Sequence, residues 1–127
     1  MHPIIDTLTR IKNSYHARHD HLVVPFSRLR FQFLALLKEQ SFIKDVTTSK
    51  NGSKKKLEIT LRYVSRRPAL TDFKTISKSS QRIYAGYRGL TPNIRGGIVV
   101  VSTSNGLLPG EEARKKRVGG EVLCEVW

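Results

Sequence analysis

Three consecutive hydroxyl side chains, an amide and a glycine form the stretch of this sequence best suited to contact a polar ligand: Ser102, Thr103, Ser104, Asn105 and Gly106. The stretch follows directly on the apolar run 98–101, which predicts a buried strand. Short hydroxyls beside a glycine put several hydrogen-bonding groups at one exposed place. Two interpretations stay open: the hydroxyls satisfy the backbone of a turn, or they contact phosphate and sugar groups.

A catalytic role for these serines lacks the partners that it would need. A nucleophilic serine requires a base, yet the histidines all lie within the first 21 residues, at His2, His16, His19 and His21. The glycines that would flank a nucleophile elbow are absent. The carboxylates are scattered, so no titratable pair is predicted, and the sequence predicts a protein that is not an enzyme.

Tyrosines alternate with arginines shortly before that region. Arg82 and Tyr84 are followed by Tyr87 and Arg88. Such a pattern could stack rings on unpaired bases while guanidinium groups hold phosphates. Tyrosines in strands also lie commonly at the edge of a core, and that interpretation stays open. Arg82 and Tyr84 are therefore candidate RNA contacts.

Two glycines and an acid close the set of candidates in the second half. Gly119 and Gly120 most simply supply positive φ angles and a close approach of two backbones. Glu121 is unusual in so basic a context. It either orients a neighbouring loop or accepts a hydrogen bond from a base amino group or a sugar hydroxyl.

The charge of the chain favours a polyanion as partner. There are 23 Lys and Arg against 10 Asp and Glu, a formal net charge of +13 over 127 residues. The cations are spread over both halves, so a folded body presents them, which suits structured nucleic acid. Lys55 lies in a lysine run beside the turn signal Asn51–Gly52, and is either solvated or a phosphate contact. A general nucleic-acid or membrane-surface binder that acts by charge alone stays open.

Several other classes of protein are disfavoured. The single cysteine, Cys124, allows no internal disulfide and is expected in the core. No metal-ligand spacing, Walker loop or dinucleotide fingerprint is present, so no cofactor is predicted. The apolar runs are too short for a membrane span, and the start of the chain lacks the order of a secretion signal. We expect a soluble, intracellular protein.

The first half of the sequence predicts the order α-β-α-β-β. A helix begins at Pro3, with one apolar stripe formed by Ile4, Ile5, Leu8, Ile11 and Tyr15. A second helix is capped by Ser27 and runs to about Gln40, with inward Leu29, Phe33, Leu36 and Leu37. Strands are predicted over 22–24, 42–47 and 57–63, with a hairpin turn at Asn51–Gly52.

A change of composition at Ser65–Pro68 indicates a boundary between an N-terminal domain, 1–64, and a C-terminal RNA-binding domain, 65–127. The second half predicts strands over 73–78, 82–85, 98–101 and 121–127, a Gly-rich loop through Gly86, Gly89 and Pro92, and a basic helix over 110–117. The predicted fold class is α+β, with two small α/β domains, the second mostly β with one short helix.

Over nearly its whole length the sequence resembles the family of small-subunit ribosomal protein S8, bacterial type. The motifs that carry the resemblance in the first half are 2–4, 8–13, 24–25, 36–39, 42–43 and 57–61. Those in the second half are 82–84, 97–98, 100–104, 119–121 and Cys124. The Ser-Thr-Ser loop followed by the closing double glycine is the most specific of them.

This resemblance implies two α/β domains packed together, and a protein that binds the central domain of small-subunit rRNA early in subunit assembly. Its partners would be that rRNA and neighbouring small-subunit proteins, with no membrane and no DNA, on a cytoplasmic or organellar ribosome. Matching positions carry RNA contact onto Ser102, Thr103, Ser104, Gly106, Tyr84, Gly120 and Glu121, and onto Arg10, Lys12 and Asn13 of the first helix.

The sequence departs from the family pattern at three places. Asn105 stands where relatives usually have lysine, so one cation is missing beside the hydroxyl stretch. Ser41 replaces a usual helix-ending glycine, and Ala85–Gly86 replaces a more basic stretch after Tyr84. The first and third departures bear on the strength of RNA contact.

Overall fold

The computed structural model describes residues 2–90 and 96–127, and the chain divides into two compact units. The first unit ends at Thr71 and the second runs from Asp72 to Trp127. The boundary expected after residue 64 falls within a short hairpin of the first unit. The predicted loop through Gly86, Gly89 and Pro92 is described only as far as Leu90, and Pro92 lies outside the described residues.

The first helix, α1 (Pro3–His16), begins as predicted with a proline in its first turn. The ring nitrogen of His2 accepts a hydrogen bond from the Ile4 amide at 3.2 Å and caps the helix. Thr7 is fully buried on the apolar face, whereas the predicted Ile5 is only partly buried. Thr7 tolerates burial because its hydroxyl donates to the Pro3 carbonyl at 2.8 Å.

The second helix, α2 (Arg28–Glu39), is capped as predicted by Ser27, whose hydroxyl accepts from the Arg30 amide at 3.1 Å. Leu34 is buried along with the predicted residues, while Leu29 is only partly buried. The buried face is wide because α2 contacts both α1 and the sheet.

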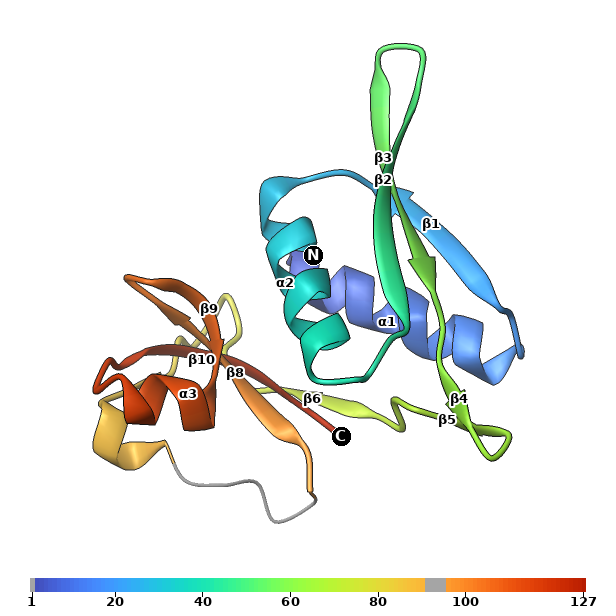
Figure 1. The fold of residues 1–127 in the computed structure, drawn as a ribbon. Helices are drawn as coiled ribbons and strands as arrows, with labels where there is room; N and C mark the ends of the chain where they lie inside the picture. The colour runs from blue at the N-terminus through green and yellow to red at the C-terminus, as the bar shows by residue number, and fades with distance from the viewer. Residues whose placement is uncertain (1, 91–95) are drawn as a thin grey trace. The chain divides into compact units, whose positions relative to one another are not determined.

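Three antiparallel strands complete most of the first unit: β1 (His21–Pro25), β2 (Asp45–Asn51) and β3 (Lys54–Thr60), in the order β1-β3-β2. Figure 1 shows α1 and α2 on one side of this sheet and the β2–β3 hairpin projecting beyond it. Leu57 and Ile59 face the core as the predicted alternation requires. The hairpin loop consists of Gly52, at φ +67°, and Ser53, one residue later than predicted.

The strand predicted over 42–47 is wrong at its start, because these residues first terminate α2. Ser41 takes a φ of +67°, and the Phe42 amide donates to the Leu37 carbonyl at 2.9 Å. A left-handed residue followed by a hydrogen bond from the next amide to a carbonyl five residues earlier is a common helix C-terminal motif, and the left-handed residue is usually glycine. Ser41 thus takes the left-handed conformation that glycine usually takes at helix ends, and the strand begins only at Asp45.

The strand predicted over 57–63 is divided. β3 ends at Thr60, and Tyr63 starts a separate short hairpin of β4 (Tyr63–Val64) and β5 (Arg67–Pro68). Its turn is formed by Ser65 and Arg66, both with positive φ. Two left-handed residues suit the twist of a two-residue hairpin.

The second unit is built on a five-stranded antiparallel sheet in the order β6-β10-β8-β9, with β7 also paired to β10. Its strands are β6 (Phe73–Thr75), β7 (Tyr84–Ala85), β8 (Ile98–Thr103), β9 (Gly106–Pro109) and β10 (Gly120–Val126). β6 and β7 are shorter than predicted and β8 is longer, since it includes Ser102 and Thr103. β9 was not predicted, because its glycine and proline are typical of a loop.

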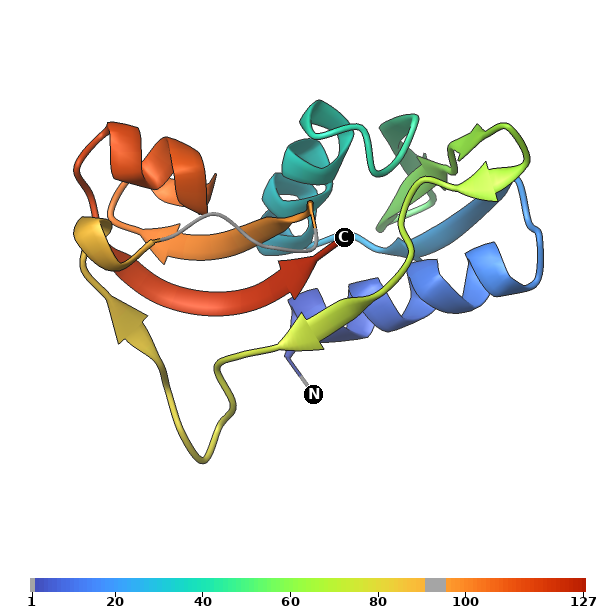
Figure 2. The ribbon, with the colours of Figure 1, turned by 90° about the horizontal axis from the view of Figure 1, so that it is seen from below.

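Helix α3 (Gly110–Lys115) lies against one face of this sheet, and a 3-10 turn, η1 (Tyr87–Gly89), precedes the core residue Leu90 (Figure 2). The helix is shorter than the predicted 110–117. The core beneath it consists of Leu90, Val101, Leu108, Ala113 and Val122. The α+β class predicted from the sequence is confirmed.

Cys124 is fully buried in β10, as expected of a small core residue. Burial raises the pKa of its thiol from 9.0 to about 12. The thiol therefore stays protonated at neutral pH. Among the described residues, no helix is both long and apolar enough to cross a membrane.

Candidate nucleic-acid interface

Tyr84, Glu121 and Ser102 form one row across three strands of the second unit. In the strand register, Glu121 of β10 lies opposite Tyr84 of β7 on one side and opposite Ser102 of β8 on the other. Residues directly opposite in an antiparallel pair direct their side chains to the same face. The three side chains therefore share one face of the sheet.

This face is the one turned away from α3. The adjacent row, Val122, Val101 and Leu108, belongs to the core and occupies the opposite face. Because side chains alternate along a strand, burial of that row leaves the Tyr84 row outside. Tyr84 is 70% exposed, an unusual position for a large aromatic side chain. We call Tyr84, Glu121 and Ser102 the exposed row.

The hydroxyl stretch turns the chain from β8 into β9. Thr103 donates its hydroxyl to the Gly106 carbonyl at 2.8 Å and accepts from the Asn105 amide at 3.0 Å. Gly106 has a φ of +96°, which favours glycine. Thr103 thus fits the interpretation of a hydroxyl that satisfies its own turn.

The two serines differ from Thr103. Ser102 and Ser104 are exposed, and neither hydroxyl has a hydrogen-bond partner among residues 2–90 and 96–127. Asn105 is likewise exposed at the tip of the turn. The stretch therefore divides into one threonine that builds the turn and three polar side chains that the turn presents to solvent.

Glu121 has a charged partner within the unit. Arg82 places a guanidinium nitrogen 3.1 Å from a carboxylate oxygen of Glu121, and the Glu121 side chain is only 15% exposed. The ion pair connects the segment before β7 to β10. A backbone hydrogen bond makes the same connection, since the Val122 amide donates to the Ile83 carbonyl at 2.9 Å. From the sequence, Glu121 is expected either to orient a neighbouring loop or to accept a hydrogen bond from RNA. Its ion pair with Arg82 fits the first of these roles.

The double glycine works by close approach and not by backbone torsion. Neither Gly119 nor Gly120 has a positive φ, so that part of the prediction is wrong. A Cβ atom on Gly120 would stand 2.0 Å from the Ser102 carbonyl oxygen, and one on Gly119 would stand 2.5 Å from the Ala85 carbonyl oxygen. Only glycine lets β10 approach β7 and β8 in this register.

Two lysines of the second unit are partly neutralised, and Arg88 contacts its neighbouring tyrosine. Lys115 and Lys116 on or after α3 pair with Glu111 and Glu112 at 3.7 and 3.2 Å. The Arg88 guanidinium lies 5.7 Å from the centre of the Tyr87 ring, so these two neighbours contact each other. Exposed ion pairs of this kind leave the groups free to exchange partners at little cost.

The remaining candidates lie in the first unit. Arg10 binds Asp6 at 3.2 Å, and Asp6 also binds Arg30 at 3.2 Å. Lys12 is partly buried and Asn13 is exposed on the same helix. Lys55 is exposed near the tip of the β2–β3 hairpin, opposite Lys50 in the register. The second unit thus brings together the candidates Arg82, Tyr84, Ser102 to Gly106, Gly120 and Glu121. The candidates Arg10, Lys12, Asn13 and Lys55 belong to the first unit.

The described residues contain no group of three or more His, Cys, Asp or Glu side chains that could hold a metal ion.

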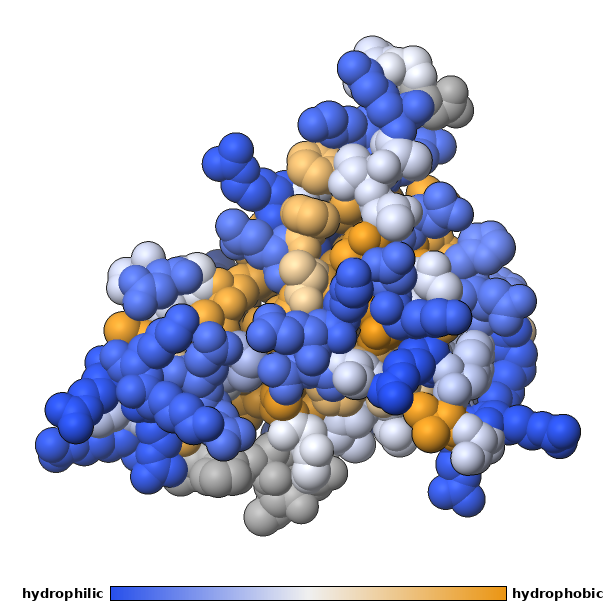
Figure 3. Space-filling model, in the orientation of Figure 1, coloured by the Kyte–Doolittle hydropathy of each residue, from blue (hydrophilic) through white to orange (hydrophobic). Residues whose placement is uncertain are grey.

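Figure 3 shows hydrophilic side chains over most of the visible face, including the β2–β3 hairpin at the top. The exposed row and its turn therefore offer hydroxyl, amide, ring and guanidinium groups on a basic protein. This combination suits contacts to sugar, base and phosphate.

Comparison with known proteins agrees with these features. The family model of ribosomal protein S8 matches residues 2–127. The chain is 41% identical to small ribosomal subunit protein uS8 of Anaeromyxobacter sp. (strain K), covering 98% of this chain and 96% of that protein. It is 39% identical to the uS8 protein of Nitratidesulfovibrio vulgaris and 44% identical to that of Zymomonas mobilis, again over 98% of this chain. With a match of this length, the chain belongs to the ribosomal protein S8 family.

Proposed function

We propose that this protein binds the central domain of small-subunit rRNA through its second unit and supports early assembly of the small subunit. The observation that carries the proposal is the exposed row with its adjoining turn. There an exposed tyrosine, a serine and a carboxylate-bound arginine lie together on a sheet face that α3 does not cover.

Family membership supplies the coarser part of the function. As a member of the ribosomal protein S8 family, the chain is a structural constituent of the small ribosomal subunit. It belongs to a class of structural proteins and not to a class of enzymes.

The chemistry of the exposed row favours recognition of RNA shape over attraction by charge alone. An irregular RNA helix presents unstacked bases and 2′-hydroxyl groups, which a tyrosine ring and short serine hydroxyls match. Arg82 is held by Glu121, so it loses little freedom when it meets a phosphate or base edge. Gly120 lets β10 approach β8 closely enough to set Glu121 beside Ser102.

The first helix adds contacts in this proposal through Arg10, Lys12 and Asn13. Asn13 is exposed, and Arg10 shares the carboxylate of Asp6 with Arg30. A half-exposed ion pair of this kind is weak enough to yield to an RNA phosphate. Neighbouring small-subunit proteins complete the partners of the ribosome-bound protein.

The test is filter binding of the purified protein to a central-domain rRNA fragment and to a regular RNA duplex of equal length across a salt series. We expect the fragment to bind more tightly at every salt concentration, although both affinities fall with salt through counterion release. The protein should also cosediment with small subunits in a high-salt gradient. Equal affinity for both RNAs would show a binder that acts by charge alone.

A further inference from the structure

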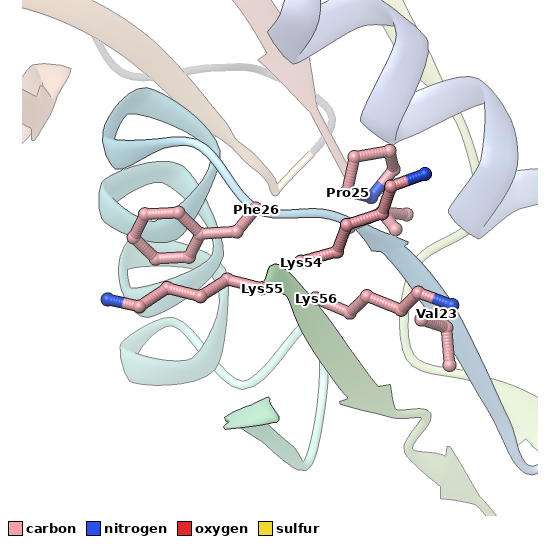
Figure 4. Close-up of a pocket in the computed structure, with 7 residues that line it drawn as sticks. Val23, Pro25, Phe26, Lys54, Lys55 and Lys56 are labelled. Atoms are coloured by element: carbon pink, nitrogen blue, oxygen red, sulfur yellow. The ribbon is translucent and has the colours of Figure 1, made fainter. Parts of the chain in front are cut away.

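A groove beside the β2–β3 hairpin has an apolar floor and a cationic rim. Val23, Pro25 and Phe26 line it from the β1 side, and Lys54, Lys55 and Lys56 line it from β3 (Figure 4). The hollow measures about 640 Å³. Val23 is 47% exposed, and the ring of Phe31, itself 39% exposed, lies 6.4 Å from that of Phe26. Two of the few exposed large apolar side chains thus belong to this region.

The lysines of the rim have no acidic partner. From Ser49 to Lys56, four of eight residues are lysine and none is acidic; the next acidic side chain along β3 is Glu58, opposite Val23 in the register. Lys50 lies directly opposite Lys55 in the strand register, and like charges so placed destabilise a hairpin. No ion pair joins any of these four lysines to a carboxylate within the described part of the chain. The hairpin keeps an unfavourable charge arrangement that a bound anionic group would relieve.

We propose that this lysine-rimmed groove binds an acidic segment of a neighbouring protein, with an apolar side chain of that segment seated on Val23 and Pro25. Carboxylates of the segment pair with Lys54 and Lys56, which extend to the side of Pro25 and Val23, whereas Lys55 extends toward Phe26 (Figure 4). An exposed apolar patch with a polar rim is typical of a protein interface. The identity of the neighbour as a small-subunit protein rests on the proposed function, but the chemistry of the groove does not.

The floor of the groove favours a protein segment over RNA. Bases stack on flat rings or guanidinium planes, whereas Val23 and Pro25 are aliphatic or saturated. The one ring, Phe26, already has the Lys55 ammonium 5.1 Å from its centre and Phe31 beside it.

The position of β1 also suits an extended segment. β1 is an outer strand of the three-stranded sheet, paired with β3 on one side. The outer edge of such a strand offers backbone groups to an added strand. A segment running along this edge would pass Val23 and would have to cross β1 near Pro25 to reach the lysines of β3.

The first experiment measures fluorescence anisotropy of a labelled peptide, Glu-Glu-Leu-Glu-Leu-Glu-Glu, with the full chain. We expect Val23→Ser to weaken binding about tenfold through lost apolar contact, and Lys54→Glu with Lys56→Glu to weaken it at least as much. Lys44→Glu is the matched control, since Lys44 is exposed at the opposite end of β2 and should change affinity less than about twofold.

A second peptide, with serine in place of both leucines, separates an apolar site from a charged surface. Equal affinity for the two peptides overturns the proposal. Tighter binding of a uridine heptamer than of the leucine peptide, weakened by Val23→Ser, would assign the groove to RNA and also overturn it. Binding of the central-domain fragment is measured on the same variants, so that failure of the rRNA site in the second unit is seen separately.

The third experiment places a photoreactive benzoylphenylalanine at Val23 in the full chain and irradiates assembled small subunits. We expect cross-links to a protein peptide that contains both acidic and apolar residues, identified by mass spectrometry. Adding Lys54→Glu and Lys56→Glu should reduce the yield several-fold, while Lys44→Glu should not. Cross-links chiefly to rRNA, or to a basic peptide, contradict the proposal.

Discussion

Arg82, in the segment before β7, and Glu121 of β10 are joined by a 3.1 Å ion pair at the edge of the exposed row. The carboxylate is mostly covered and the guanidinium is about half exposed. Such a pair adds little to stability, because solvent screens the arginine. Its effect is to restrict where Arg82 points, next to Tyr84.

Replacing Glu121 by glutamine tests whether this restraint serves RNA recognition. We expect Glu121→Gln to weaken binding of the central-domain fragment about tenfold, the loss of roughly one charge-assisted hydrogen bond. Binding to a regular duplex should stay equal or tighten slightly, because a negative charge is removed. Glu111→Gln makes the same charge change at an exposed pair on α3 and should leave the preference for the fragment intact. A uniform gain for both RNAs with Glu121→Gln would show that Glu121 only repels phosphate.

The hydroxyl stretch should separate into binding and folding roles. Ser102→Ala with Ser104→Ala should cost about 1 to 3 kcal/mol of RNA binding and little stability, because neither hydroxyl bonds within the described residues. Thr103→Val should instead lower the free energy of unfolding by about 1 to 2 kcal/mol, since it removes both turn hydrogen bonds. Filter binding and urea unfolding measure the two effects. If the serine pair changes neither, the stretch serves only as a turn.

The asparagine at the tip of this turn predicts a salt effect. Asn105→Lys should tighten binding of the fragment more at low salt than at high salt, because a lysine near phosphate releases a counterion. The slope of log affinity against log salt should steepen by up to about one unit. Filter binding of both forms across a salt series measures it, and an unchanged slope would mean that position 105 does not face the RNA backbone.

Gly120→Ala should destabilise the second unit. The new methyl group would stand 2.0 Å from the Ser102 carbonyl oxygen, so β10 must move away from β8 at a cost of about 3 kcal/mol. Gly86→Ala is the matched control, because nothing lies within 4 Å of its Cβ position and its φ is −73°. Urea unfolding followed by circular dichroism compares the two, and equal stability would contradict the close approach.

Cys124 predicts a loss of stability at alkaline pH. Its pKa is raised by burial to about 12 in the folded chain, from 9.0, so the unfolded chain loses the thiol proton first. Its contribution to stability is complete below about pH 9 and is lost as pH rises toward 12. The difference in unfolding free energy between the native chain and Cys124→Ala should narrow over that range. A difference that stays constant with pH would contradict the raised pKa.

Local features of the sequence were enough to predict the helices, the fold class and the family. The Ser27 cap and the apolar stripe of α1 act between residues that are close in the chain, so spacing alone reveals them. The wrong strand predictions occur where one local sequence preference competed with another. The strand β2 begins later than predicted because residues after Ser41 first terminate α2. β9 was missed because Gly106 and Pro109 are residue types typical of loops.

The sequence by itself also determined the chemical character of the candidate RNA site, since hydroxyls, tyrosine and cations can be read directly. Only the tertiary structure decided that Tyr84, Glu121 and Ser102 share a row, that Thr103 serves its own turn, and that Arg82 binds Glu121. The physical reason is that strand pairing sets register between segments distant in the chain, and a shift of one residue would turn every side chain to the other face. The lysine-rimmed groove likewise exists only because β3 pairs with β1.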